Sequence, residues 1–552
     1  MSVALPTAST RARVATPVPE RVDVAIIGAG LGGLMTAARL ARAGRKVAVL
    51  DAHYVAGGCC TMFGRSLRAG EGFVGGPVTF DIGLHYVGDC GPGGRIPTML
   101  AEVGVDVEWL PLDPDGFDEL IFPDLRFRIP ASIELYRDRL VAAFPGEKSG
   151  IDRYIRLVRE VGVLGRPHAP KGWRMAWEAA TRARVAAWNK GATLGAFLDT
   201  CTRDPRLRAV IAGQNGDYGL PPGKVSLMLH AGLVAHYLGG AYYPRGGGQV
   251  IADRLAAVIE GAGGTIHLRH PVTGIRVESG RATGVYWRGP HDPREQPAAV
   301  LAADVVVSNA DLKRTIGELL PHEAVAPALR EQAAGWEMGG AIFLTCLAVK
   351  ADLKSLGMGA TNYWQFDHYD FDALYAEGLA RVGTGEGPPP VRGCYITSAT
   401  RKDPDSPGHA PAGVETVEVM ALVPGASDVW GVIPGDVATP RYRAQEAYQR
   451  HKSTVEADLV GRLERLFPGS TAAIVHIESA TPVTHSRFTG ASAGSGYGLA
   501  ATPSQFLQNR PGARSPIPGL YFAGANTRTG HGVTGALGSG VQAARAIERD
   551  RA

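Results

Sequence analysis

The sequence predicts an α/β fold in which a discontinuous dinucleotide-binding domain is interleaved with a second, α+β domain. Residues 22–51 show a strand, a glycine turn, a helix and a second strand, and residues 241–309 contain further helix and strand patterns. Residues 517–548 add a strand, a glycine-rich turn and a helix. Because segments of different character separate these three, we expect the chain to leave one domain twice and to return to it twice.

Length and composition exclude several classes of protein. The 552 residues include 57 Lys and Arg against 53 Asp and Glu, a net charge of +4 that is too small to predict a nucleic-acid partner. The six cysteines show no zinc spacing and no disulfide framework, which predicts no metal site and a reducing, cytoplasmic compartment. Residues 1–21 are polar and predict a disordered tail rather than a signal peptide, and no run of 18 apolar residues exists to span a membrane.

The first segment, VDVAIIGAGLGGLMTAARLARAGRKVAVLD, carries the most specific motif. Gly28, Gly30 and Gly33 form G-x-G-x-x-G between a strand and a helix, and Asp51 ends the next strand. In such a turn the first glycine allows the bend, the second admits a pyrophosphate and the third packs helix on strand, while the acid binds a ribose hydroxyl. A Rossmann-type site is therefore predicted. The expected bounds are 22–27 for the first strand, 31–43 for the helix and 46–50 for the second strand.

The later segments complete this domain. We expect strands around Val272 and Val285, a buried strand over residues 301–309 and a last helix that starts near Val533. The predicted division is a tail at 1–21, a dinucleotide-binding domain at 22–91, 241–315 and 471–552, and a substrate-binding domain at 92–240 and 316–470.

Four further segments are similar to those of one family. They are AGGCC at 56–60, FDIGLHYVG at 80–88, YYPRGG at 242–247 and GLYFAGANTRTGHGVTGAL at 519–537. With the glycine turn, they resemble the FAD-dependent carotenoid desaturase, carotenoid isomerase and retinol saturase (all-trans-retinol 13,14-reductase-like) group, the retinol saturases most of all. The resemblance implies a glutathione-reductase/amine-oxidase-like FAD-binding fold and a flavoenzyme acting on carbon–carbon double bonds of a hydrophobic isoprenoid or polyene.

The resemblance also assigns residues to FAD. The two glycines of AGGCC match a loop beneath the pyrophosphate, Thr61 would bond a phosphate, and Val272 would contact adenine through its backbone. Cys59 and Cys60 then become small residues of a tight cofactor seat, with catalytic, redox or metal-binding roles as alternatives. The residues expected to contact FAD are Gly28, Gly30, Leu31, Gly32, Gly33, Asp51, Gly57, Gly58, Thr61, Val272, Gly524, Asn526 and Val533.

A flavin supplies hydride transfer at N5, which supports saturation, desaturation or, through both in turn, isomerisation of a double bond. The sequence contains no second strand–G-x-G-x-x-G–helix unit, so NAD(P)H is expected at most as a transient electron donor. For the proton we predict His85, Tyr86 and His531. If the strand in FDIGLHYVG continues past Asp81, His85 projects toward the substrate space and Tyr86 away from it. Other polar candidates, each also explained as a hydrogen-bonded wall residue, are His230, His236, Tyr242 and Tyr243, whereas Arg245 is expected to hold the domain crossing.

Two alternative functions and one membrane contact stay open. An amine-oxidase-like flavoenzyme shares the FAD domain, and Rab GDP-dissociation inhibitors share the fold but bind prenyl groups without FAD and without catalysis. The intact glycines and Asp51 favour an enzyme. Residues 171–190 can form one helix that gathers Trp173, Trp177 and Trp188 among basic residues, which is typical of a peripheral membrane helix. Burial against the second domain would explain the same stripe.

Overall fold

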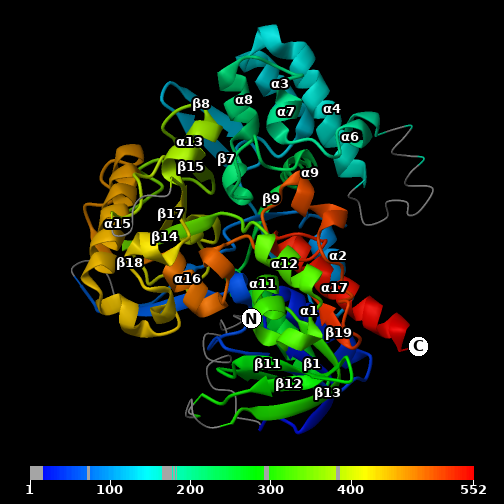
Figure 1. Cartoon of the computed structure of the whole chain (residues 1–552). Helices are drawn as coiled ribbons and strands as arrows, with labels where there is room; N and C mark the ends of the chain where they lie inside the picture. Colours follow the sequence, from blue (N-terminus) through cyan, green and yellow to red (C-terminus); the bar gives the residue numbers. More distant parts are fainter. Residues whose placement is uncertain are drawn as a thin grey trace.

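Two seven-stranded β-sheets organise the structure, a computed structural model that describes residues 17–70, 75–164, 177, 181, 183–290, 292, 297–380 and 386–551. The first sheet lies at the lower end of Figure 1, the second in its left half, and a group of helices at the upper end. The first and last strands of the chain both belong to the first sheet, as a discontinuous dinucleotide-binding domain requires.

The first sheet has the order β10-β2-β1-β13-β12-β11, with β19 beside β13. Its core strands run parallel, and β11 and β12 join antiparallel. The predicted strand–helix–strand unit and the strands around Val272 and Val285 are confirmed. The strands are β1 (Arg21–Ile27), β2 (Val47–Asp51), β10 (Thr265–Leu268), β11 (Val272–Glu278), β12 (Arg281–Trp287), β13 (Ala299–Ser308) and β19 (Leu520–Phe522).

Helices cover both faces of this sheet, which explains why its central strands are apolar throughout. Val24 and Ile26 of β1 pack in the core formed with α1, α10 and α17. Ala25 and Ile27 point into the opposite core, which α11 shares. These helices, with the neighbouring α12, are α1 (Leu31–Arg42), α10 (Gln249–Gly261), α17 (Gly532–Asp550), α11 (Leu312–Arg314) and α12 (Pro327–Gly335).

The second sheet has the order β18-β14-β17-β16-β15-β7-β8. The long helix α15 (Glu446–Leu466) covers it at the left of Figure 1, where Val455, Leu459 and Leu463 share a core with Val417 and Val419. The strands are β7 (Asp118–Phe122), β8 (Leu125–Ile129), β14 (Ala341–Val349), β15 (Asn362–Phe366), β16 (Gly393–Thr397), β17 (Glu415–Val423) and β18 (Ile474–Ala480).

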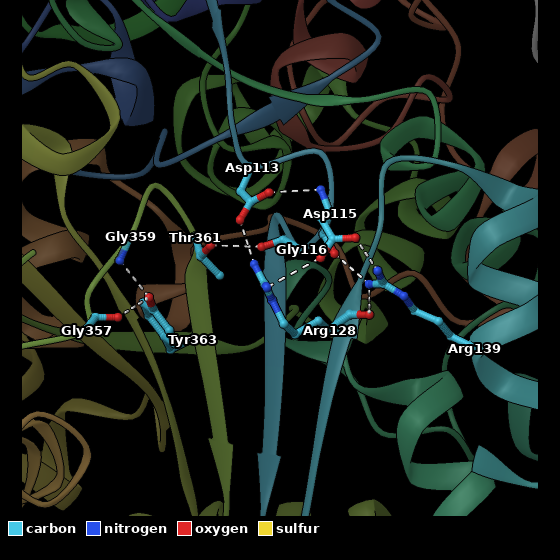
Figure 2. A network of polar contacts seen from close by, with 9 residues as sticks. All are labelled: Asp113, Asp115, Gly116, Arg128, Arg139, Gly357, Gly359, Thr361 and Tyr363. Carbon is cyan, nitrogen blue, oxygen red and sulfur yellow. Dashed lines mark hydrogen bonds and ion pairs between the residues drawn. The ribbon is translucent and has the colours of Figure 1, made fainter. Parts of the chain in front are cut away.

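A polar network fixes the end of this sheet at which β7 begins (Figure 2). Arg128 of β8 donates to the carboxylate of Asp113 at 2.6 Å. The hydroxyl of Thr361, just before β15, donates to the carbonyl of Gly116 at 2.9 Å. These contacts hold the backbone that leads directly into Asp118, whose carboxylate contacts the hydroxyl of Tyr86 at 3.1 Å.

The remaining helices and two small sheets connect these layers. Helices α3, α4, α7 and α8 gather at the upper end of Figure 1, and α4 packs on α9. The helices are α2 (Arg95–Ala101), α3 (Ile133–Ala143), α4 (Lys148–Leu164), α6 (Arg184–Trp188), α7 (Leu194–Leu198), α8 (Pro205–Ala212), α9 (Leu227–Tyr237), α13 (Phe371–Gly378), α14 (Ala399–Lys402) and α16 (Pro482–Thr489). The small sheets pair β3 (Met62–Leu67) with β4 (Gly76–Asp81), and β9 (Ala241–Pro244) with β5 (Val87–Gly88) and β6 (Trp109–Pro111).

The packing differs from the predicted domain boundaries in two places. Strand β18 hydrogen-bonds to β14 in the second sheet, although it lies within the segment 471–552 predicted for the dinucleotide-binding domain. Ile316 and Trp336 are buried in the core of the first sheet, although 316–470 is the predicted substrate segment. Strand pairing and core packing, which local sequence patterns do not specify, decide both positions. The division into two domains itself stays a prediction.

Residues 171–190 do not form one continuous helix, contrary to the prediction. Ala183 has non-helical φ and ψ angles of −125° and 46°, and α6 begins after it. Trp173 lies outside the described residues, whereas Trp177 and Trp188 are 55% and 87% exposed. Burial against the second domain therefore does not explain these two side chains. None of the helices that the structure describes is long and apolar enough to cross a membrane.

Candidate functional site

A cavity of about 1350 Å³ extends from the carboxyl ends of β1, β2 and β13 to α4, α9 and α13. Pockets for one small ligand usually measure about 300–1,000 Å³, so this cavity has room for a cofactor and a substrate together. Segments from both ends of the chain meet on it. Of the predicted FAD contacts, its walls contain Gly28, Gly30, Leu31, Gly32, Asp51, Gly57, Gly58, Thr61, Val272, Gly524, Asn526 and Val533.

Two glycine loops approach each other at the N-terminus of α1. Gly30 pairs with Gly57 in an isolated bridge, and the N–H of Gly57 donates to the carbonyl of Ala29 at 2.8 Å. A Cβ on Gly58 would lie 3.1 Å from the Cα of Gly30, and its φ of 61° also favours glycine. A cradle without side chains at a helix N-terminus fits the pyrophosphate of a dinucleotide such as FAD.

Gly33 lies behind this cradle and not on the cavity wall. A Cβ at this position would be 2.2 Å from the carbonyl oxygen of Gly28. Gly33 therefore permits the close packing of α1 on β1, and its expected role in FAD binding is indirect.

Asp51 is held rigidly at the end of β2. Its Oδ2 accepts the N–H of Ala29 at 2.6 Å, and its Oδ1 accepts the N–H of His53 at 2.7 Å. Burial raises the pKa of Asp51, and the two backbone hydrogen bonds oppose this effect. Asp51 lines the cavity, and each carboxylate oxygen keeps a lone pair for a ribose hydroxyl.

Asn309 is the main element of this end that sequence analysis missed. It follows β13, lines the cavity, and donates from Nδ2 to the carbonyl of Gly28 at 3.2 Å. A Cβ on Gly32 or Gly524 would lie 2.6 or 2.8 Å from Oδ1 of Asn309. Asn309 could have been recognised from its position at the carboxyl end of a predicted strand, since ligands in open α/β sheets bind at the carboxyl ends of strands.

Two predicted FAD contacts have partners within the protein. The hydroxyl of Thr61 donates its proton to the carbonyl of Gly58 at 2.9 Å. Its oxygen can therefore only accept a further hydrogen bond, and it has no proton left to donate to a phosphate. Oδ1 of Asn526 accepts the N–H of Leu499 at 2.8 Å, so the amide NH₂ is the part of Asn526 that remains for a flavin.

The adjacent cysteines are free thiols. Cys59 is exposed to the cavity, and its enclosure by the surrounding protein raises its pKa to about 11. Cys60 also lines the cavity, and it donates from Sγ to the carbonyl of Gly248 at 3.2 Å. Both thiols are protonated at neutral pH, which favours small wall residues over nucleophiles. In the described ranges, no group of three or more His, Cys, Asp and Glu side chains could hold a metal ion.

His85 lines the cavity, but it does not lie on a strand as predicted. Strand β4 ends at Asp81 and β5 begins at Val87, so the strand does not continue through His85. The ring is buried, and neither ring nitrogen has a hydrogen-bond partner among the described residues. The ammonium of Lys402 donates to the carbonyl of His85. Burial, aided by Lys402, lowers the pKa of His85 to about 3.

Tyr86 lines the same cavity and does not point away from it. Its hydroxyl contacts Oδ2 of Asp217 at 2.7 Å and Oδ2 of Asp118 at 3.1 Å. Its ring stacks on Tyr237 with centroids 4.5 Å apart. Sequence analysis missed both aspartates, which lie far from Tyr86 along the chain.

The other polar candidates divide into those that line this cavity and those that do not. His531 lines the cavity, and burial lowers its pKa to about 4. His236 also lines it, but His230 is enclosed by Tyr154 and Tyr218. The hydroxyl of Tyr243 donates to Asp81, and neither residue lines the cavity. Tyr242 is half-buried. Arg245 forms ion pairs with Glu108 at 2.8 Å and with Asp403 at 3.4 Å, which agrees with the structural role predicted for it.

Beyond these groups the cavity is mainly apolar. Leu164 of α4, Met228 and Leu233 of α9, and Phe371 and Leu374 of α13 line it. This arm starts at the aromatic side chains around Tyr86. It can enclose an elongated hydrophobic molecule and exclude water from it.

Two family models match parts of the chain. One, described as an NAD(P)-binding Rossmann-like domain, covers residues 26–103, and the other, described as a flavin containing amine oxidoreductase, covers residues 437–548. An all-trans-retinol 13,14-reductase of Danio rerio is 28% identical over 93% of this chain and 83% of its own length. A chloroplastic prolycopene isomerase of Daucus carota is 26% identical over 96% of this chain and 80% of its own.

Solved structures agree on the fold. Cyclohexylamine oxidase from Brevibacterium oxydans superposes with a TM-score of 0.57 at 17% identity, over 97% of this chain and 100% of its own. The predicted fold class and the predicted resemblance to the FAD-dependent carotenoid and retinol group are confirmed. The comparisons also confirm the prediction of an FAD-dependent oxidoreductase.

Proposed function

We propose that this FAD-dependent oxidoreductase acts on the carbon–carbon double bonds of an elongated apolar polyene. The observation that carries the proposal is the continuity of one cavity from the dinucleotide cradle at Gly30 to the apolar arm at Phe371 and Leu374. The names of the relatives, a retinol reductase and a prolycopene isomerase, support polyenes as the substrate class.

Different residues along this cavity would bind the cofactor, bind the substrate and transfer the proton. Gly30, Gly57 and Gly58 would admit the pyrophosphate, and Asp51 would orient the ribose. Bound FAD would supply hydride transfer. The apolar arm would position the polyene and exclude water, and a wall group would hold or release the proton.

Among the possible reactions, we place double-bond saturation or desaturation first and cis–trans isomerisation second. The order follows the relatives, whose identities are 28% for the reductase and 26% for the isomerase. An amine oxidase is the next alternative, because a flavin containing amine oxidoreductase model matches residues 437–548.

Product analysis on the purified protein tests the proposal. We expect a visible flavin band and, after chemical reduction of the flavin, a gain of two hydrogens by a retinoid or carotenoid from a panel. Oxidation of amines, with no change in any polyene, would favour the amine-oxidase alternative. A colourless protein that binds prenyl lipids would favour the non-enzymatic alternative.

Electron donor and membrane contact are finer proposals. We propose NAD(P)H as a transient donor, which anaerobic mixing tests: NADH or NADPH should bleach the flavin band, and no bleaching with either would exclude this role. We also propose peripheral membrane contact through the segment 171–190, supported by the exposure of Trp177 and Trp188.

A further inference from the structure

The hydroxyl of Tyr86 lies between two carboxyl groups, with its oxygen 2.7 Å from Asp217 and 3.1 Å from Asp118. Burial raises the pKa of Tyr86 well above its ordinary value, so the hydroxyl keeps its one proton and can donate only one of the two hydrogen bonds. In the other contact the proton must come from the carboxyl group, because two buried lone pairs facing each other would repel. One of the two aspartates is therefore protonated.

The surroundings decide which aspartate holds this proton. Asp118 also accepts from Nδ2 of Asn362 at 3.0 Å and from Nε2 of Gln214 at 2.8 Å, and three donors suit an ionised carboxylate. Burial raises the pKa of Asp118 only to about 6, since these donors oppose it. For Asp217, the described part of the chain provides one side-chain partner, Tyr86. Burial and the nearby Asp118 raise the pKa of Asp217 well above its ordinary value.

Other titratable groups around the pair reinforce this assignment. Tyr237 and Tyr395 stay neutral, because burial raises the pKa of both. His531 is also neutral at pH 7, since its pKa is lowered to about 4. Lys402, with its pKa lowered by burial to about 8, interacts electrostatically with Asp118 and favours the ionised form of that residue.

Asp217 is the member of the pair that faces the cavity. It ends the short helix η3 (Asn215–Asp217) and lines the cavity beside Tyr86, whereas Asp118 lies behind them on β7. The His531 ring interacts with the backbone of Asp217. His531 directly precedes α17, so Asp217 lies beside the C-terminal turn whose residues are the predicted flavin contacts.

We propose that Asp217 is the proton donor for double-bond reduction and that Tyr86 and Asp118 are positioning residues that hold its proton; this rests on the proposed function. One alkene carbon gains two electrons and a proton as hydride from the bound reductant, a reduced flavin. As the neighbouring carbon forms its new C–H bond, the O–H bond of Asp217 breaks, and its electron pair stays on the carboxylate. The Tyr86 hydroxyl then turns its one proton from Asp118 to this carboxylate, while Asp118 keeps the hydrogen bonds from Gln214 and Asn362, and a proton from water later restores the acid.

Infrared difference spectroscopy of the flavin-loaded protein at pH 7 tests the protonation state. We expect Asp217→Asn to lose the C=O stretching band of a protonated carboxyl group relative to wild type. Glu478→Gln is the matched control, because Glu478 also lines the cavity but pairs with Arg65 at 2.6 Å, and it should lose a carboxylate band instead. Loss of a carboxylate band from Asp217→Asn would overturn the proposal.

Two further measurements test the roles. Tyr86→Phe keeps the stacked ring but removes the hydroxyl, so the protonated-carboxyl band should shift in frequency and persist; an unshifted band would overturn the positioning role. In a single turnover with chemically reduced flavin, Asp217→Asn should reduce a polyene about 10²–10⁴-fold more slowly than wild type at equal flavin content. A rate within about threefold of wild type, far below that contribution, would overturn the donor role.

Failure of the proposed function would look different. If wild type neither saturates, desaturates nor isomerises a polyene, the proposed function fails, and the donor role fails with it. The infrared comparison needs no substrate and still decides which aspartate holds the proton.

Discussion

The side-chain amide of Asn309 donates a hydrogen bond to the carbonyl oxygen of Gly28, 3.2 Å away. This bond joins the end of β13 to the turn after β1, and it places Oδ1 of Asn309 where a Cβ on Gly32 or Gly524 would collide with it. Asn309 therefore connects the first and last glycine turns of the dinucleotide end through one side chain.

Asn309→Asp should weaken FAD binding. The substitution keeps the shape but places a carboxylate oxygen against the carbonyl of Gly28 and adds charge beside the predicted phosphates. Loss of the hydrogen bond to the half-buried Gly28 carbonyl and repulsion of the phosphates together cost about 1–3 kcal/mol in the FAD-bound state, which corresponds to about 5–150-fold in the dissociation constant. Flavin fluorescence titration of the apoprotein measures it. Asn189→Asp is the matched control, since Asn189 donates to the Val185 carbonyl in α6. Equal FAD affinity in Asn309→Asp and wild type would contradict this prediction.

Gly30→Val should purify without colour. A Cβ at residue 30 would lie 2.9 Å from Nδ2 of Asn309, and the larger side chain would also fill the cradle beside Gly58. The absorption spectrum of the purified variant gives its flavin content. Gly261→Ala is the control, because nothing lies within 4 Å of the added Cβ. Stoichiometric flavin in Gly30→Val would reject the assignment of this loop.

The residues of the dinucleotide-binding end could be predicted from the sequence more fully than the residues that would transfer the proton. Gly28, Gly30 and Asp51 act within one strand–helix–strand unit, where spacing along the chain determines spacing in the fold. Asp217 contacts Tyr86 across 131 residues, and Asn309 contacts Gly28 across 281, so no local periodicity indicates either contact.

The errors have the same physical origin. A period of two predicts where residues point only while a strand lasts, and β4 ends at Asp81, before His85 and Tyr86. Helical spacing likewise grouped the tryptophans of residues 171–190, but the backbone at Ala183 interrupts the helix.

Acid should destabilise the protein in part through His230. Its ring lies between the hydroxyls of Tyr154 at 3.0 Å and Tyr218 at 3.1 Å, and burial lowers its pKa to about 3. Below about pH 6.5 the unfolded chain binds a proton that the folded protein does not bind. Above that pH, the contribution of His230 to the free energy of unfolding does not change with pH. Between about pH 6.5 and pH 3, protonation of the unfolded chain lowers the free energy of unfolding by about 1.4 kcal/mol per pH unit.

Urea unfolding at pH 7, 6 and 5 measures this slope. His230→Gln should be less stable than wild type at pH 7, yet its free energy of unfolding should fall less steeply with acid. His322→Gln, at an exposed position, is the control and should keep the wild-type slope. An unchanged slope in His230→Gln would show that His230 does not contribute.

Trp177 and Trp188 should contribute to binding of anionic vesicles. Their side chains are 55% and 87% exposed, and transfer of one large apolar side chain out of water contributes about 1.5–3 kcal/mol. The double variant Trp177→Ala/Trp188→Ala should therefore bind at least about tenfold more weakly in liposome co-sedimentation. Ile433→Ala changes another exposed apolar residue, 68% exposed, and should bind as wild type does. Wild-type binding by the double variant would exclude this surface as the anchor.

His85→Gln separates the two candidate proton donors. The pKa of His85 is lowered to about 3, so the ring is uncharged at neutral pH, and a neutral imidazole releases its N–H proton reluctantly. If Asp217 supplies the proton, a flavin-replete His85→Gln variant should reduce a polyene within about threefold of wild type in a single turnover, whereas a lost general acid costs about 10²–10⁴-fold. His531→Gln is the parallel variant, because the His531 ring interacts with the backbone of Asp217. A hundredfold loss in His85→Gln, with Asp217→Asn close to wild type, would assign the proton to His85 and reduce the Tyr86 network to a structural role.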